Sequence, residues 1–284
     1  MRGQLGGAGK TPTVVALAQR LAARGVAAHV VTRGHGGSLA RGDASPVRVD
    51  ERRHRAGEVG DEPLLLAAFA PVWIGRDRAA AARAAVAAGA QAIVMDDGFQ
   101  NPGLAKDLSI VVVDAGFGFG NGRVMPAGPL REPVADGLAR AGLVLVIGPP
   151  AERARFRGAW PAVERLAVAE GSLEPLATGM DWTGLRALAF AGIGRPEKFF
   201  ATLRGLGAEL VAAHGFDDHA AYPPRLLARL AAEAQAAGAQ LVTTEKDAVR
   251  LPAAFRTGVL VLPVRLDLDD WSPLDAALGR LGLG

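Results

Sequence analysis

The chain has 284 residues and a formal net charge of +3. Half of its residues are hydrophobic, which is enough to form the buried core of one large domain or of two ordinary ones. The absence of cysteine excludes disulfide bonds and cysteine-ligated zinc sites. Charged residues are interspersed, without the basic run typical of a nucleic-acid-binding arm, and no apolar run is long enough to span a membrane.

Residues 6–12, Gly-Gly-Ala-Gly-Lys-Thr-Pro, have the features of a phosphate-binding loop. Glycines let backbone N–H groups turn inward on a phosphate, Lys10 adds a positive charge, and the Thr11 hydroxyl can ligate Mg²⁺. A helix that starts at Thr11 would point its positive dipole end at the same anion. Because Gln4 replaces the first glycine of the full pattern, a chance match is the alternative. Apolar residues at helical spacing over 13–24 favour a nucleotide site that comprises Gly6, Gly7, Ala8, Gly9, Lys10, Thr11 and Pro12.

The residues before this loop do not have the pattern of a strand. A phosphate-binding loop normally joins a buried strand to a helix, but Met1-Arg-Gly-Gln-Leu5 has no β-branched run. We therefore expect that the central strand belongs upstream of this sequence.

The first part of the chain alternates short apolar strands with helical patterns. Strands are predicted at 26–32, 72–75, 91–95, 109–114 and 143–148, and helices at 61–69 and 76–88. This alternation predicts a parallel sheet covered on both faces, with the loops at the strand C-termini gathered around the glycine-rich loop.

A second alternation follows a stretch at 155–180 that we interpret as ending in a linker. Strands are predicted at 185–191, 209–213, 240–243 and 259–263, and helices at 196–206, 223–237 and 273–281. The sequence thus predicts an α/β fold: a P-loop NTPase-like parallel-sheet domain over 1–180 and a smaller α/β domain over 181–284.

Asp96 and Asp97 directly follow an apolar strand. Carboxylates at this position in a P-loop protein hold Mg²⁺, directly or through water. The alternative is an ordinary Asp-Gly turn or helix cap. We favour the metal role, because a turn does not need two carboxylates.

Asp61 and Glu62 stand at the start of a predicted helix, followed by Pro63. Asp61 is a natural helix cap at this place, and it is equally suited to accept a proton from a substrate hydroxyl. Spacing alone leaves these two roles equally weighted.

Arg131 and Glu132 end a loop rich in glycine and proline, which begins after the strand at 109–114. Arg131 could stabilise charge on a phosphoryl group in transfer, and Glu132 could reach Mg²⁺. A plain surface ion pair between them is the alternative.

His219, which follows two aspartates, is a candidate proton partner if it lies in a cleft, although an isolated histidine is more often a surface or core residue. Lysine is scarce in this chain, since only Lys10, Lys106, Lys198 and Lys246 occur among 32 basic residues. A lysine in such a chain more often marks a place where a compact ammonium is required, which makes Lys246 a further candidate.

Taken together, these segments closely resemble the tetraacyldisaccharide 4′-kinase family of lipid A biosynthesis. The resemblance runs from residue 3 to about 251 and rests on the loop at 6–12, Arg-Gly-His-Gly-Gly at 33–37, Gly-Asp-Glu-Pro at 60–63 and Asp-Asp-Gly-Phe-Gln at 96–100. It also includes Phe-Gly-Asn-Gly at 119–122, Pro-Ala-Gly-Pro-Leu-Arg-Glu-Pro at 126–133, Asp-Asp-His at 217–219 and Thr-Thr-Glu-Lys-Asp-Ala-Val-Arg at 243–250.

The resemblance implies transfer of the ATP γ-phosphate to the 4′-hydroxyl of a tetraacylated glucosamine disaccharide 1-phosphate, a glycolipid. It implies two lobes facing a cleft and a membrane-associated N-terminal helix at the cytoplasmic face of the bacterial inner membrane. We expect a monomer that binds no nucleic acid. The implied catalytic residues are Asp61 as the base, His219 as its partner, Arg131 and Lys10, and the implied magnesium residues are Thr11, Asp96, Asp97 and Glu132.

The sequence departs from the family pattern in three places. His35 stands where an aromatic residue is usual, Ala220 where a second histidine is common, and residues 1–5 do not match the strand before the loop. The main alternative function is a P-loop ATPase of the partitioning or metal-insertion type, which acts by nucleotide-dependent association. Such proteins often have a lysine before the two glycines, where this chain has Leu5.

Overall fold

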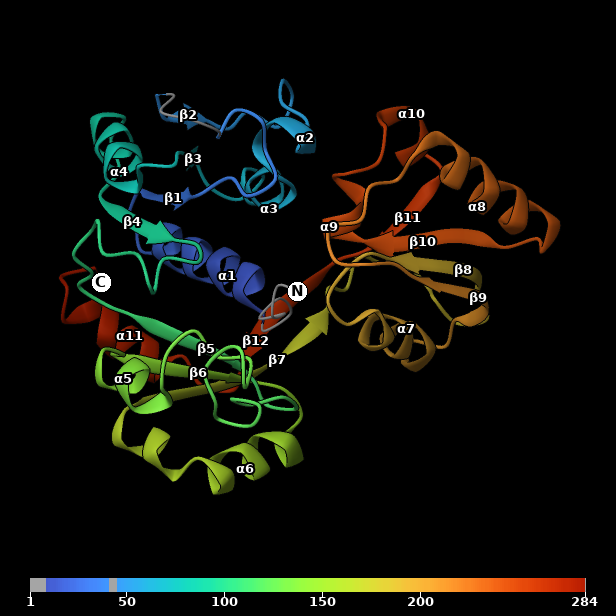
Figure 1. The fold of residues 1–284 in the computed structure, drawn as a ribbon. Helices are drawn as coiled ribbons and strands as arrows, with labels where there is room; N and C mark the ends of the chain where they lie inside the picture. The colour runs from blue at the N-terminus through green and yellow to red at the C-terminus, as the bar shows by residue number, and fades with distance from the viewer. Residues whose placement is uncertain (1–8, 41–44, 284) are drawn as a thin grey trace.

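The computed structural model describes residues 9–40 and 45–283, and within these ranges the strands form three four-stranded sheets (Figure 1). The first sheet has the order β2-β3-β1-β4. Its strands are β1 (Ala28–Thr32), β2 (Val47–Arg48), β3 (Val72–Ile74) and β4 (Ala92–Met95). β1 is parallel to both β3 and β4, as the sequence predicts, and the short β2 pairs antiparallel at the edge.

The second sheet has the order β12-β7-β6-β5. It contains β5 (Ile110–Asp114), β6 (Leu143–Ile147), β7 (Ala167–Pro175) and β12 (Val264–Leu268). Helix α1 (Lys10–Ala23) packs between the first two sheets and contacts β1 on one side and β12 on the other. One apolar core therefore joins these two sheets into a single N-terminal lobe, with Val14 and Leu21 of α1 against Val30, Leu145 and Leu266.

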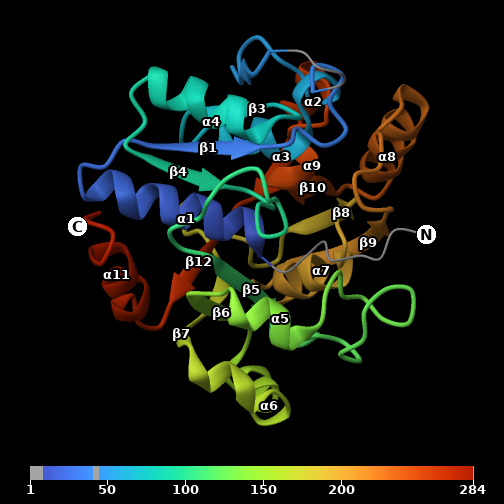
Figure 2. The same ribbon diagram turned by 60° about the vertical axis from the view of Figure 1, so that its left-hand side comes forward.

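The third sheet, of order β11-β10-β8-β9, forms a separate C-terminal lobe, which stands apart in Figure 1 and lies behind the N-terminal lobe in Figure 2. Its strands are β8 (Arg186–Ala191), β9 (Glu209–Gly215), β10 (Gln240–Thr244) and β11 (Val259–Leu262). Because side chains alternate along a strand, β8 supplies alanines to one face and Leu188 and Phe190 to the other. Helix α7 (Pro196–Gly205) covers the first face and α8 (Pro224–Ala236) the second.

The remaining helices have four to ten residues each. They are α2 (Ala56–Val59), α3 (Asp61–Leu66), α4 (Arg78–Ala87), α5 (Val134–Ala139), α6 (Pro150–Ala159), a 3-10 turn (Pro161–Arg165), α9 (Glu245–Ala248), α10 (Ala253–Arg256) and α11 (Ser272–Gly279). Helix α3 ends earlier than the predicted 61–69, and α4 is slightly shorter than 76–88.

The stretch at 155–180 contains more regular structure than the sequence predicts: the second half of α6, a 3-10 turn and β7, a nine-residue strand that pairs with both β6 and β12. Residues 178–183, where the linker is predicted, form neither helix nor strand and connect β7 to β8. Glu170, Ser172 and Glu174 alternate with apolar residues in β7, so it lacks the continuous apolar run expected of a strand buried on both faces.

The division at residue 181 also needs correction at the C-terminal end. β12 and α11 return to the N-terminal lobe, where β12 pairs antiparallel with β7. Leu274 and Leu278 of α11 join the core around α1, and Arg20 and Arg24 of α1 form ion pairs with Asp275. The C-terminal lobe thus ends near residue 262.

Candidate active site

The phosphate-binding loop leads directly into α1, which begins at Lys10, one residue before the predicted start. Gly9 has φ of 80°, and a Cβ there would lie 2.6 Å from Ile147 Cδ1, so only glycine fits. Thr11 and Pro12 lie in the first turn, where the missing N–H of proline costs no hydrogen bond. Gly6, Gly7 and Ala8 lie outside the described residues.

Asp97 is the centre of a charged cluster at the C-terminal end of β4. Lys10 Nζ lies 2.9 Å from Asp97 Oδ1, and Arg131 Nη1 lies 3.5 Å from Asp97 Oδ2. Burial opposes ionisation of Asp97, but the attraction and hydrogen bonds of the two cations outweigh it and lower its pKa. Asp97 also has φ of 50°, an uncommon conformation for a non-glycine residue. The structure thus brings together three predicted site residues from separate segments.

Asp96 is the most buried carboxylate of this cluster, with 3% of its surface exposed. No hydrogen bond to its side chain occurs within the described part of the chain. Burial, together with the nearby charges of Glu62 and Asp97, raises its pKa to about 7. A buried carboxylate without a donor is suited to a cation, and carboxylate oxygens are the ligand type that Mg²⁺ prefers.

Glu132 is held by other side chains rather than by Arg131. Its carboxylate accepts hydrogen bonds from Arg140 at 2.5 and 2.6 Å and from Gln100 at 2.9 Å, and these partners outweigh burial and lower its pKa. Residues 9–40 and 45–283 contain no group of three or more acidic or histidine side chains arranged to hold a metal by themselves. A cation here would therefore need phosphate oxygens as further ligands.

Arg131 does not form the surface ion pair with Glu132 that the sequence allowed. It bridges Asp97 and Gln100, with 3.4 Å between Arg131 Nη1 and Gln100 Oε1. The loop that carries Arg131 is tied back on itself, because Asn121 Nδ2 donates to the Ala127 carbonyl at 2.9 Å. Arg131 therefore faces the phosphate side of the site.

Asp61 and His219 meet between the two lobes. His219 Nδ1 lies 2.9 Å from Asp61 Oδ2 and 3.1 Å from Oδ1. Asp61 is 6% exposed and is the first residue of α3, whose N-cap is Gly60, so Asp61 does not occupy the N-cap position. The Glu62 backbone N–H is the one main-chain donor to its carboxylate within the described ranges. The arrangement therefore favours a chemical role for Asp61 over a capping role.

The charges around the Asp61–His219 pair favour the ionised form of Asp61. Burial alone would raise the pKa of Asp61, but the His219 hydrogen bond and the charges of Lys246 and Arg250 outweigh it and lower that pKa. The bond to Asp61 raises the pKa of His219, against burial and the charge of Lys246. Asp61 is therefore a carboxylate at neutral pH.

The sequence did not single out Arg250, although it lies within the Thr-Thr-Glu-Lys-Asp-Ala-Val-Arg segment. Its Nε is 3.6 Å from Asp61 Oδ2, and its other nitrogens donate to the Gly192 and Ala220 carbonyls, each at 2.8 Å. It also pairs with the fully buried Asp247. The spacing of residues along the chain does not predict that Arg250 lies beside Asp61, because the two residues belong to different lobes.

Glu62 connects the two charged clusters. Its carboxylate lies 3.3 Å from Lys246 Nζ, beside the Asp61–His219 pair. After burial, the charge of the same carboxylate is the next cause of the raised pKa of Asp96 in the metal-side cluster. The candidate base and the candidate phosphate site therefore belong to one continuous charged site.

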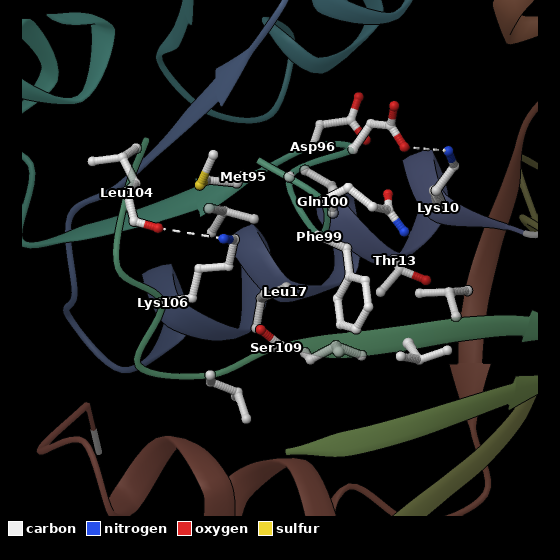
Figure 3. A pocket seen from close by; sticks show the side chains of 18 of the residues that line it. Lys10, Thr13, Leu17, Met95, Asp96, Phe99, Gln100, Leu104, Lys106 and Ser109 are labelled. Carbon is white, nitrogen blue, oxygen red and sulfur yellow. Dashed lines mark hydrogen bonds and ion pairs between the residues drawn. The ribbon is translucent and has the colours of Figure 1, made fainter. Parts of the chain in front are cut away.

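An apolar groove of about 1280 Å³ extends from the phosphate end of this site, between β4 and β5 (Figure 3). Lys10 and Asp96 lie at one end, Leu104 and Lys106 lie at the other, and the Phe99 ring points into it. Within the described residues β4 pairs only with β1, and β5 only with β6. The strand edges that face the groove are thus unpaired there.

Comparisons with known proteins agree with this geometry. Residues 3–281 match the sequence model of the LpxK family, described as tetraacyldisaccharide-1-P 4′-kinase. A tetraacyldisaccharide 4′-kinase from Dinoroseobacter shibae is 67% identical over 277 residues, which cover 97% of this chain and 81% of the relative. Another, from Rhodospirillum rubrum, is 50% identical over 279 residues, covering 98% of this chain and 83% of the relative.

A solved structure shares the fold. The crystal structure of LpxK from Aquifex aeolicus in complex with ATP has a TM-score of 0.71 and 23% sequence identity to this chain. The match covers 98% of this chain and 85% of that one. The α/β, P-loop-type fold predicted from the sequence is confirmed.

Proposed function

Because this chain belongs to the tetraacyldisaccharide-1-P 4′-kinase family, we propose that it transfers the γ-phosphate of ATP to the 4′-hydroxyl of a tetraacylated glucosamine disaccharide 1-phosphate. The observation that carries the proposal is the position of Glu62, which joins a phosphate-binding cluster to a buried carboxylate–histidine pair. A phosphotransferase needs both parts in one cleft: one part holds the anion, and the other orients the acceptor hydroxyl.

The phosphate cluster supplies positive charge where the transferring group carries negative charge. Lys10 and Arg131 approach the same Asp97 carboxylate from two segments, so both cations converge on one point of the site. Phosphoryl transfer involves little covalent chemistry for the protein, and fixed cations of this kind provide much of the rate enhancement. Mg²⁺, held by Thr11, Asp96 and Asp97 with Glu132 nearby, would neutralise further phosphate charge when bound.

Asp61 accepts the proton of the acceptor hydroxyl in this proposal. Its lowered pKa keeps it ionised at neutral pH, and the His219 N–H holds its carboxylate in one orientation. His219 thus acts through Asp61 from the opposite lobe.

The wider setting is also a proposal. We expect this protein to work as a monomer at the cytoplasmic face of the bacterial inner membrane, bound to its glycolipid acceptor and to no nucleic acid. Among the helices of the described residues, none is both long and apolar enough to cross a bilayer.

The test compares ADP release and lipid phosphorylation with and without a tetraacyldisaccharide 1-phosphate acceptor in detergent micelles. We expect ADP release to depend strictly on the acceptor, with phosphate recovered on the lipid. Equal ADP release in both samples would instead favour a P-loop ATPase of the partitioning or metal-insertion type, an alternative that the family match does not favour.

We further propose that the groove between β4 and β5 holds a strand that leads into the phosphate-binding loop and runs parallel to both neighbours. Two observations support this occupant: each flanking strand is paired on its far side only, and Val14, Leu17 and Leu21 of α1 line the groove. A strand there would be buried on both faces.

An N-terminal extension of six valine and isoleucine residues is therefore expected to raise the thermal unfolding midpoint by about 5 °C or more, because it buries apolar surface and pairs both edges. The measurement is thermal unfolding followed by circular dichroism. A glycine–serine extension of equal length is the control. Equal midpoints for the two extensions would contradict the proposal.

A further inference from the structure

Lys246, at the start of α9, contacts three side chains at the boundary between the lobes. Its Nζ lies 3.1 Å from Asp218 Oδ1, 3.3 Å from Glu62 Oε1 and 3.3 Å from His219 Nε2. Its side chain is 19% exposed. None of these contacts involves the phosphate cluster, so the phosphate chemistry leaves this scarce lysine without a role.

The chemistry of the three groups fixes the protonation of His219. An ammonium group can only donate hydrogen bonds, and an ionised carboxylate can only accept them. Lys246 Nζ lies 3.3 Å from Nε2, and a hydrogen bond between them requires Nε2 to be unprotonated, with the single ring proton on Nδ1. The Nδ1–H then points at Asp61, 2.9 Å away. The chain of donors therefore runs from Lys246 through His219 to Asp61.

We propose that Lys246 is a positioning residue that holds His219 Nε2 as an acceptor and so keeps His219 a neutral donor to Asp61. This inference rests on the proposed role of Asp61 as the base. A neutral imidazole orients the Asp61 carboxylate without placing a second full positive charge directly against it. Asp61 thereby remains a better proton acceptor than it would be beside an imidazolium.

The surroundings of His219 show that the charge of Lys246 is needed for this effect. The charged and titratable groups that face the ring are Asp61 from α3, Lys246 from α9, Asp218 from the same loop and the His35 ring, whose centroid is 6.3 Å away. The two carboxylates raise the pKa of His219, and Lys246 opposes them. Without Lys246, protonation of Nε2 would be favoured over a wider pH range.

The bridge to Glu62 adds a second consequence. Glu62 belongs to α3 of the N-terminal lobe, and Lys246 and His219 both come from the C-terminal lobe. Lys246 therefore orients the histidine and its own lobe against α3 through adjacent contacts. Burial lowers the pKa of Lys246, but the charges of Glu62, Asp61 and Asp218 outweigh it and raise that pKa, so the side chain stays a donor throughout the working pH range.

The direct test is a ¹⁵N NMR titration of the ring nitrogens in histidine-labelled protein, with His219→Gln used for assignment. In the wild-type chain we expect the neutral form to have its proton on Nδ1. In Lys246→Met the titration midpoint of His219 should rise by about one pH unit, because the opposing positive charge is gone. Lys246→Arg, which retains a charged donor, should move the midpoint back toward the wild-type value.

Kinetics provide a second measurement, whose pH dependence would not change if Lys246 had only a structural role. We expect Lys246→Met to lower kcat by about 10- to 100-fold with little change in KM for ATP, and a higher pH should restore part of the loss as His219 deprotonates. Arg186→Met is the matched control, because Arg186 pairs with Glu209 at an exposed site of the same lobe. Thermal unfolding of each variant identifies any loss of folding.

An unchanged His219 midpoint in a folded Lys246→Met variant would overturn the inference. The NMR titration needs neither ATP nor acceptor, so it separates this inference from the proposed function. A shifted midpoint in a protein without acceptor-dependent kinase activity would support the Lys246–His219 contact and reject the kinase proposal. Acceptor-dependent kinase activity together with an unshifted His219 midpoint would support the kinase proposal and reject the proposed role of Lys246.

Discussion

Asp61→Asn is expected to lower kcat by about 10²- to 10⁴-fold, the usual contribution of a positioned base, while KM for ATP changes little. Asn fills nearly the same space as Asp but cannot take a proton from the acceptor hydroxyl. Asp61 also lies beside His219 and Arg250 rather than against Lys10, so nucleotide binding should survive. The measurement is steady-state phosphorylation of the glycolipid at varied ATP, together with direct ATP binding.

The control for Asp61→Asn is Glu58→Gln, which changes a nearby carboxylate on α2 whose partner is the Arg55 backbone N–H. Gln can still accept that bond, so this variant should retain activity. A pH titration adds an independent check: since Asp61 raises the pKa of His219, its removal should lower the His219 midpoint. A parallel loss of kcat and ATP affinity would instead indicate that Asp61 is a structural residue of α3.

Lys10→Ala is expected to reduce phosphoryl transfer by about 10³-fold or more, the scale typical of a lost cation at the transferring phosphate. Lys10→Arg should restore little, because a planar guanidinium does not replace a compact ammonium at the start of a helix. The structure adds a second expectation. Lys10 lowers the pKa of Asp97, so its loss should raise that pKa and weaken any cation site there at low pH.

Single-turnover transfer at saturating ATP measures the effect of Lys10→Ala on the chemical step. Arg83→Ala is the control, since Arg83 is an exposed cation of α4 paired with Asp77 at 3.8 Å. Purified Lys10→Ala protein that retains wild-type transfer would reject the kinase proposal, because no other cation contacts Asp97 from the phosphate-binding loop in the described residues.

Much of the local structure follows directly from the sequence. The apolar runs that end at Met95, Asp114 and Ile147 are strands, and the helix after the glycine loop begins within one residue of its predicted start. These elements are encoded by residue periodicity over short windows, which is why they are predictable. β7 escaped prediction for the same reason, because its alternating polar residues hide a strand that is completed only by pairing with β12.

The residues of the candidate site also differ in how far the sequence alone predicts them. Residue types alone predicted Lys10, the acidic pair after β4 and Arg131 as site residues, since each occurs in a local motif with a specific chemistry. By contrast, the alternatives for Asp61 stayed open, because a carboxylate at a helix start has the same local pattern whether it caps or catalyses.

The sequence by itself determined the phosphate-binding loop, the α/β class and the family resemblance, because these depend on residues close together in the chain. The resemblance implied His219 as the partner of Asp61, and only the tertiary structure shows their contact, across 158 positions of sequence. The tertiary structure also places Arg250 beside Asp61 and Lys246 beside His219, and it returns β12 to the N-terminal lobe. The physical reason is that ion pairs and sheet pairing between distant segments depend on how the lobes pack, which no local periodicity encodes.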